Sequence, residues 1–348
     1  MKKIIALVIS LVLLLSCAAA GAGFAEEDKL NVVVTIFPVY DWVREIVGAD
    51  MDHVNLTLLL DSGVDLHSYQ PTARDIMTIS TADLFVYVGG ESDEWVEDVL
   101  ASAMNPDLAA LSLVDAMGDD IKAEEIVEGM EHEHEHEHEH EHEHEEDEDH
   151  EHEEEEHEHE HEHEHEHEEE EADEHVWLSL RCAQKLTAAI AEAVEGVDPD
   201  HAAHYRENAA AYTAKLADLD ARYAETVNAA AFKTLLFGDR FPFRYLADDY
   251  GLDYFAAFTG CSAESEASFA TVMFLARKMD ELGLPAVLTL EHPTTRIAQT
   301  VAENTAAKNR KILALDSMQG TTAADIAAGV TYLSVMESNL GVLAEALN

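Results

Sequence analysis

Residues 30–37 have the sequence Leu-Asn-Val-Val-Val-Thr-Ile-Phe, a continuous apolar run rich in β-branched side chains. Such a run is typical of a strand that is buried on both faces of a parallel sheet. The runs 54–60 and 84–88 repeat the pattern, and residues 38–50 and 71–82 have helical spacing. Alternating strands and helices predict an α/β lobe with a mostly parallel sheet.

The second half of the chain repeats this alternation after two expected helices. Residues 176–195 predict a helix that ends at Gly196 and Pro199, and residues 200–228, without Gly or Pro, predict a helix about 40 Å long. Four strand-like runs and a final helix follow, at 234–237, 253–258, 286–290, 312–315 and 323–347. We therefore expect an α/β protein with two parallel-sheet lobes, 29–197 and 230–348, joined by a rigid linker helix over 198–229.

The N-terminus has the features of an export signal. Lys2 and Lys3 precede an apolar run over 4–15 and then small residues, which predicts a signal peptide over 1–25. Leu14-Leu15-Ser16-Cys17 resembles a bacterial lipobox, in which Cys17 would carry the lipid. We expect an extracytoplasmic protein held at the cell membrane by this anchor alone, or a periplasmic one if the lipobox is not used.

About half of the net charge of -53 comes from one segment. Residues 131–171 contain only Glu, Asp and His, with 15 histidines and 26 acidic residues. Its repelling charges and lack of apolar side chains predict a disordered loop, and neutral histidines can bind zinc near pH 7. A solubilising spacer would explain the acid but not the histidines. The accessory metal loop would use His132, His134, His136, His138, His140, His142, His144, His150, His152, His157, His159, His161, His163, His165 and His167.

Two histidines outside this loop lie where ligands are expected. His67 stands in Asp-Ser-Gly-Val-Asp-Leu-His-Ser-Tyr-Gln-Pro (61–71), between a predicted strand and a helix, and His175 opens a predicted helix in Asp-Glu-His-Val-Trp-Leu-Ser-Leu (173–180). Ligands of open α/β sheets gather beyond the carboxyl ends of strands. Two neutral imidazoles on separate loops can converge on one zinc ion.

These motifs, in this order, resemble those of the metal-binding solute-binding proteins of bacterial ABC importers, especially the zinc branch (cluster A-I type). Residues 64–71 match a D-x-H-x-Y-x-P loop, 175–178 match an H-V-W-L motif, and 131–171 match a His- and acid-rich loop between them. Gly89-Gly90-Glu91 with Trp95 resembles a further family segment. The resemblance implies high-affinity Zn²⁺ capture in a cleft between the lobes and delivery to an importer made of a permease and its ATPase.

The resemblance also implies ligands from the second lobe, where this chain departs from the pattern. The family places His or Glu in an H-D-A-F-x-Y-F-like segment, and a gap-free alignment with 237–246 puts Arg240 at that position. Arginine has no acceptor and stays protonated, so it cannot coordinate. Asp239, one residue earlier, becomes the expected third ligand, with water, Glu264 or Glu266 as alternatives.

The usual fourth ligand is an Asp after the last strand, and Asp316 matches it in context. Its alternative role is a helix or turn cap, which Asp commonly provides. Glu291 resembles a family carboxylate near the site. With two imidazoles and two carboxylates, Zn²⁺ would be four-coordinate and neutralised. The sequence leaves open whether Cys182 and Cys261 pair, because the distance between them decides it.

Other functions remain as alternatives. Carboxylate ligands leave room for a manganese- or iron-binding protein of the same fold, although the histidine-rich loop favours zinc over Mn²⁺. A cell-surface zinc-storage or adhesion protein is the second alternative. An enzyme is not expected, because outside the Glu/His segment 131–171 the sequence has no H-E-x-x-H motif, and it has no G-x-S-x-G motif and no Gly-rich phosphate loop. The acidic surface excludes nucleic acid as a partner, and we expect a monomer. His53, His201 and His204 are expected to be solvated.

Overall fold

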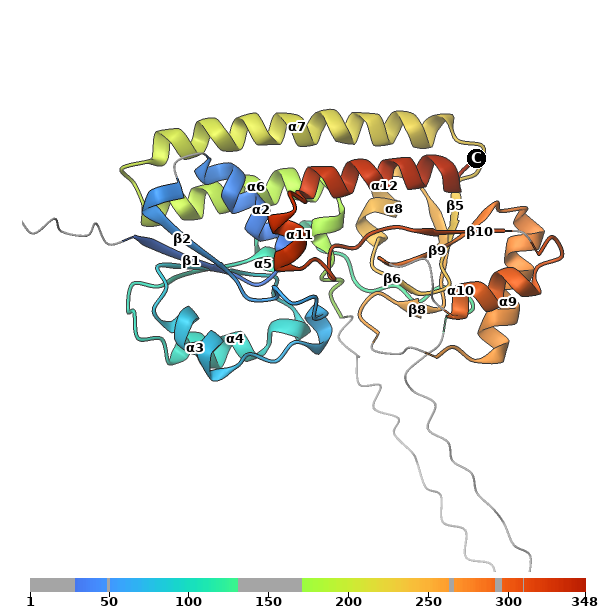
Figure 1. The fold of residues 1–348 in the computed structure, drawn as a ribbon, viewed down its shortest axis with the longest axis horizontal. Coiled ribbons are helices and arrows are strands. Elements are labelled where there is room, and N and C mark those ends of the chain that lie inside the picture. The colour runs from blue at the N-terminus through green and yellow to red at the C-terminus, as the bar shows by residue number, and fades with distance from the viewer. Residues whose placement is uncertain (1–28, 49–50, 131–170, 263–265, 292–295, 309) are drawn as a thin grey trace, which may run out of the picture.

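The protein folds as two α/β lobes with one long helix lying along both (Figure 1). The structure is a computed structural model that describes residues 29–48, 51–130, 171–262, 266–291, 296–308 and 310–348. The predictions for the signal peptide with Cys17, for the loop histidines and for Glu264 fall outside these residues. Within the described ranges, no helix combines the length and the apolar character that a membrane span needs.

The N-terminal lobe is built on a four-stranded parallel sheet in the order β2-β1-β3-β4. Its strands are β1 (Leu30–Val34), β2 (Val54–Leu58), β3 (Leu84–Tyr87) and β4 (Ala109–Ser112). Val32 and Val34 face a core shared with helices α2 (Phe37–Val47) and α6 (Leu180–Val197), whereas Val33 packs toward α3 (Ala73–Ser80) and α4 (Trp95–Ala101). Alternate side chains of β1 are therefore buried in two layers, which explains its continuous apolar run.

The C-terminal lobe contains three parallel strand pairs, β5–β7, β9–β10 and β6–β8, and a bridge from Phe237 to Leu288 joins the first two. The strands are β5 (Thr234–Leu236), β6 (Arg240–Phe241), β7 (Asp253–Phe255), β8 (Phe258–Thr259), β9 (Ala286–Thr289) and β10 (Lys311–Ala314). The helices after β5 are α8 (Arg244–Tyr250), α9 (Phe269–Leu282), α10 (Arg296–Asn304), α11 (Ala323–Ala327) and α12 (Tyr332–Ala346). The two-lobe α/β fold expected from the sequence is confirmed.

Helix α7 (Ala202–Ala229) is the expected linker and spans both lobes (Figure 1). One face of it is buried at intervals of three and four residues, which keeps a single stripe toward the core. The buried residues are Tyr205, Ala209, Tyr212, Leu216, Leu219, Tyr223 and Val227. This stripe packs on α2 and α6 in the first lobe and on α12 in the second, so one continuous apolar core ties the lobes together.

Three details differ from the sequence predictions. The helix expected from residue 176 starts with a short 3-10 turn, η5 (Val176–Leu178), and α6 begins only at Leu180. The final helix is two helices, because Gly329 takes a φ of 98° that helical residues do not adopt. Strand β4 was not expected, because it is only four residues long and its sequence, Ala-Ala-Leu-Ser, has low strand propensity.

Candidate metal site

His67 reaches the cleft from the 3-10 turn η2 (Leu66–Ser68), which follows β2. The Asp65 carboxylate caps this turn by accepting a hydrogen bond from the His67 backbone N–H at 3.0 Å. The ring Nδ1 lies 2.8 Å from the Ser92 hydroxyl and 3.7 Å from a Glu174 carboxylate oxygen. With Nδ1 engaged on this side, Nε2 is the atom directed into the cleft.

His175 stands at the N-terminal end of η5 and is fully buried. Its Nδ1 lies 2.9 Å from a carboxylate oxygen of Asp173, and the same oxygen accepts the His175 backbone N–H. A carboxylate behind a ligating imidazole is the usual arrangement in metal sites, because it fixes the tautomer and directs the other nitrogen toward the ion. The geometry therefore presents Nε2 of His175 as the ligand atom.

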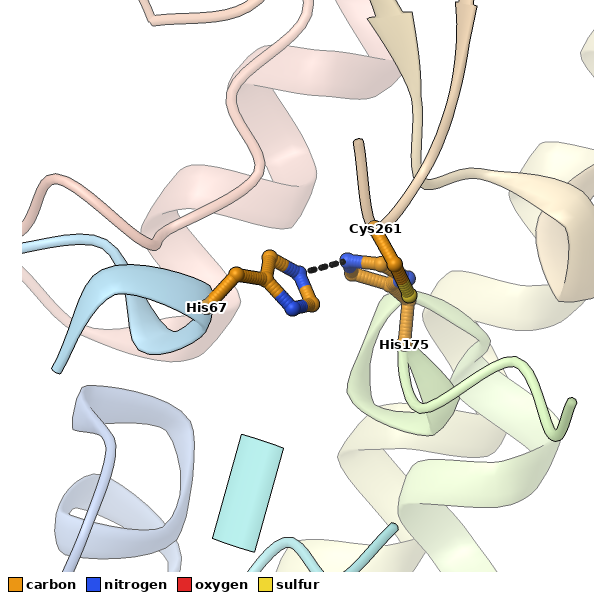
Figure 2. Close-up of side chains that lie close together, drawn as sticks. All are labelled: His67, His175 and Cys261. Carbon is orange, nitrogen blue, oxygen red and sulfur yellow. Dashed lines mark hydrogen bonds between the residues drawn. The ribbon is translucent and has the colours of Figure 1, made fainter. Parts of the chain in front are cut away.

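The two imidazoles and one thiol converge at the cleft (Figure 2). The Nε2 atoms of His67 and His175 are 3.1 Å apart, and the Cys261 sulfur completes a group in which all three ligand atoms lie within 4.8 Å of one another. Cys261 comes from the C-terminal lobe, directly after β8 and Gly260. The ligand atoms thus come from three separate segments and from both lobes.

Gly260 allows the segment that carries Cys261 to lie close to His175. A Cβ at position 260 would stand 3.0 Å from Cε1 of His175 and 3.1 Å from the carbonyl oxygen of Phe241. Both neighbours are fixed, one by its hydrogen bond to Asp173 and the other by the backbone. The absence of a side chain at Gly260 therefore lets the Cys261 backbone lie against the histidine ring.

Burial favours the uncharged forms of the His67 imidazole and the Cys261 thiol in the absence of a cation. It lowers the pKa of His67 to about 3, and repulsion from the neighbouring His175 adds to this effect. Burial also raises the pKa of the Cys261 thiol, with further contributions from Glu124 and Glu174. A neutral imidazole has its lone pair ready for a metal, whereas a coordinating thiol loses its proton to the solution when the metal arrives.

The structure does not bring the two predicted aspartates into this cluster. The Asp239 carboxylate accepts backbone N–H groups of Arg240, at 3.0 Å, and of Leu290, at 3.3 Å. Asp316 accepts the Met318 N–H at 2.7 Å, which is the turn-cap role weighed as its alternative. Among the described His, Cys, Asp and Glu residues, the group at the cleft consists of His67, His175 and Cys261.

Arg240 places a positive charge near the carboxylates of Asp65, Asp239 and Glu291. Its guanidinium forms an ion pair with Asp65 of the first lobe, and it also donates to the Ser262 carbonyl at 3.3 Å. Burial raises the pKa values of Asp239 and Glu291, and the positive charge of Arg240 offsets part of this rise. Glu291 accepts a hydrogen bond from the Ser317 hydroxyl, and the side chain of Glu266 is exposed.

Cys261 is a candidate ligand that the sequence does not indicate, because two isolated cysteines without a C-x-x-C spacing predict a poor zinc-thiolate site. Both described cysteines, Cys182 and Cys261, are free thiols in this structure. The available signal was position, because Cys261 follows the strand-like run 253–258 just as the loop with His67 follows the strand-like run 54–60. A lone cysteine gives no spacing pattern, so only the fold shows which histidines it faces.

The fold and these ligand positions define a metal-binding solute-binding protein. The chain matches the model of the ZnuA family, described as zinc-uptake complex component A, periplasmic, over residues 32–346. The protein belongs to this family. Sequence analysis reached the same family through the motifs around His67 and His175, and that identification is confirmed.

Relatives are found among zinc-binding and zinc-uptake proteins of Streptococcus pneumoniae and Bacillus subtilis. The chain is 32% identical over 343 residues to the zinc-binding lipoprotein AdcA of Streptococcus pneumoniae strain R6, covering 99% of this chain but only 60% of AdcA. It is 32% identical over 327 residues to the high-affinity zinc uptake system protein ZnuA of Bacillus subtilis strain 168, covering 94% and 90% of the two chains.

Two solved structures have the same fold. The Zn(II)-bound ZnuA-like domain of S. pneumoniae AdcA aligns with a TM-score of 0.66 at 28% identity, covering 92% of this chain and 99% of the domain. The metal-dependent lipoprotein YcdH of B. subtilis aligns with a TM-score of 0.68 at 26% identity, with 92% and 99% coverage. The pneumococcal lipoprotein is longer than this chain, and its domain is the part that corresponds.

Proposed function

We propose that this protein captures Zn²⁺ outside the cytoplasm, in the cleft between its lobes, and delivers it to a membrane ABC importer. His67, His175 and Cys261 would be the protein ligands. The observation that carries the proposal is the meeting of two Nε2 atoms 3.1 Å apart with a thiol from the opposite lobe. The names of the relatives support zinc as the ion, since they are described as zinc-binding and zinc-uptake proteins.

The spacing of the two nitrogens fits a tetrahedral ion. With Zn–N bonds of 2.0–2.1 Å and tetrahedral angles, two imidazole nitrogens lie roughly 3.3 Å apart. The 3.1 Å between the Nε2 atoms of His67 and His175 needs only a slight change to reach that value. The Cys261 sulfur then takes a third position, and water or a nearby carboxylate takes the fourth.

The donor set favours zinc over manganese. Two imidazoles and a thiolate are softer donors than the two carboxylates expected from the sequence, and thiolates select zinc over hard ions such as Mn²⁺. Replacing Asp239 and Asp316 by one thiolate leaves a net charge of about +1 on the Zn²⁺ site. Asp173 and Glu174, placed behind the two imidazoles, offset that charge.

Binding and release follow from the placement of ligands on both lobes. An ion held by His67 and His175 from one lobe and Cys261 from the other bridges the cleft and favours its closed form. The linker helix α7 and the core shared by the lobes resist wide opening. We therefore expect a small tilt between lobes, which docking on the permease would use to expose the ion.

The proposed function is tested by measuring tight zinc on the full chain. Chelator competition on the wild type should retain one ion that resists strong chelators, together with weaker ions on the histidine-rich loop. The His67→Ala/His175→Ala variant should lose that ion. A His132→Ala/His134→Ala variant, which also removes two histidines, should keep it. If both variants retain the resistant ion equally, the cleft is not the capture site and zinc storage by the loop becomes the better reading.

Delivery needs a separate measurement in cells. Cells that make this protein would be compared with cells carrying only the His67→Ala/His175→Ala variant, under zinc limitation. We expect slow uptake of radioactive zinc in the variant cells and normal uptake in cells with the loop variant. Equal zinc uptake in cells with the wild-type protein and in cells with the His67→Ala/His175→Ala variant would refute delivery, even if the cleft binds zinc tightly in the purified protein.

A further inference from the structure

A second group of metal-ligating side chains lies in the N-terminal lobe, away from the cleft. It consists of His53, Asp198 and His201, whose ligand atoms all lie within 4.8 Å of one another. The two histidines were expected to be solvated, because His53 lies in a short polar stretch before a strand and no third ligand is near His201 in the sequence. In the folded chain their rings stack, with centroids 4.1 Å apart.

The fold brings three segments together at this point. His53 ends the short 3-10 turn η1 (Met51–His53) that leads into β2. Asp198 follows the last residue of α6, and His201 precedes the first residue of α7. The group therefore sits where the α6–α7 connection passes the amino ends of β1 and β2, at the opposite end of these strands from the loop that carries His67 (Figure 1).

One carboxylate holds the group together. Nδ1 of His201 lies 2.8 Å and Nε2 of His53 lies 3.5 Å from the same Asp198 oxygen. The buried Tyr205 donates its hydroxyl to that oxygen at 2.5 Å, and its Oη also lies 2.8 Å from His53 Nε2. Tyr205 is itself fully buried in the core, so it fixes the position of the carboxylate.

The group is open enough for an ion to enter. The side chains of His53, Asp198 and His201 are 20%, 14% and 41% exposed. They line a surface groove together with Asp83 and Asp200, and the lining also includes one lysine, Lys29. Carboxylates in excess over ammonium groups give the groove a negative potential that attracts cations.

From this geometry we propose that His53, Asp198 and His201 form a second binding site for a divalent ion of the zinc and copper class. Two imidazoles with one carboxylate suit borderline ions, and the open sides of the site leave positions for water. Binding requires the lone pairs of His53 Nε2 and His201 Nδ1, so a proton on either nitrogen passes to solvent. The rings must also turn out of their stack until both nitrogens face the ion, which their exposure permits.

His204 provides an internal comparison for this assignment. Its spacing of three from His201 on α7 would place both side chains on one helix face. In the structure the His204 Nε2 lies 3.0 Å from the amide nitrogen of Asn208, and His204 does not belong to the cluster around Asp198. His204 is therefore the matched control for variants of His201 and His53.

An ion at this site would act differently from the ion in the cleft. All three ligands belong to the first lobe or its junction with α7, so the site does not bridge the lobes. It would connect η1 and the start of β2 to the α6–α7 connection. The folded chain would become more stable as the concentration of the free ion rises above its Kd. The proposal does not depend on the function proposed for the cleft.

Two measurements on the full chain test the proposal. Crystals grown with zinc should show anomalous scattering between His53 and His201 at the zinc absorption edge. In solution, zinc should raise the melting temperature of the wild type and of the His204→Asn variant by the same amount. The rise should be smaller by several degrees in His53→Asn and His201→Asn. The loop contributes equally in all four proteins and cancels from the comparison.

Folding defects are separated from lost binding by melting each variant without zinc. Asp198→Asn is the second variant, because its amide oxygen can still accept the Tyr205 hydroxyl while its affinity for a cation falls. Equal zinc-dependent shifts in all variants, or anomalous density confined to the cleft, would overturn the second site. An intact cleft ion in the His53→Asn variant would show that the two sites are independent.

Discussion

The proposed site makes a sharp prediction, namely that Cys261, and neither Asp239 nor Asp316, serves as the third ligand. We predict that Cys261→Ser weakens metal binding at the cleft strongly, whereas Asp239→Asn and Asp316→Asn leave it within about threefold. The reason is distance. The Cys261 sulfur lies within 4.8 Å of both histidine ligand atoms, and the two carboxylates accept backbone N–H groups instead.

The size of the effect follows from the number of ligands. Structural zinc sites with four protein ligands bind with roughly 10–16 kcal/mol at pH 7, or about 2.5–4 kcal/mol per ligand. A site with three protein ligands that loses one should therefore weaken by about 10²–10³-fold in Kd. A serine hydroxyl at the same place is a poor ligand near neutral pH and recovers little of this loss.

Cobalt provides an assay specific to the cleft. Co²⁺ bound by a thiolate shows an intense charge-transfer absorption in the near ultraviolet, and imidazole or carboxylate ligands do not produce it. Since the segment 131–171 contains no cysteine, ions bound there are silent in this band. We expect the full chain to show the band, Cys261→Ser to lose it, and the matched control Cys182→Ser to keep it. Zinc would then displace cobalt in a titration that yields the affinity.

Two results would refute the reasoning. If Cys261→Ser retains the charge-transfer band and the wild-type affinity, the thiol is not a ligand. If Asp239→Asn or Asp316→Asn weakens binding by a hundredfold or more, the second lobe contributes carboxylates as the sequence resemblance implied. In that case the lobes would have to move on binding, because the Asp239 carboxylate is held by Arg240 and Leu290 in this structure.

Further predictions concern the packing at the site and the stability of the fold. Gly260→Ala should weaken cobalt and zinc binding at the cleft about tenfold or more, because the added Cβ would stand 3.0 Å from the His175 ring, whereas Gly196→Ala, with no atom within 4 Å, should have no effect. Asp41→Asn should stabilise the protein at pH 7.5 by up to about 3 kcal/mol and leave it unchanged near pH 4, as urea unfolding at both pH values would show. Burial raises the pKa of Asp41 to about 6, above its value in the unfolded chain, so the wild type loses stability as the pH rises from about 4 to 6. The asparagine keeps an acceptor for the Tyr332 N–H without carrying a charge, and an equal effect at both pH values would contradict this explanation.

The sequence determined most of the elements, their order and the two candidate histidines of the first lobe. These are local properties. The apolar run at 30–37, the uninterrupted helical stretch at 200–228 and the motifs around His67 and His175 each depend on neighbours within a few residues. Periodicity and short motifs carry that information directly, so the α/β fold and the family followed from them.

The tertiary structure alone decided which side chains complete the sites. Cys261 is distant in sequence from His67 and His175, and the contact depends on Gly260 letting the loop after β8 lie against the His175 ring. His53 and His201 are joined in the same way, through a carboxylate fixed by the buried Tyr205. Such contacts depend on how lobes and connections pack in space. A lone cysteine or histidine has the same local pattern whether or not a partner faces it.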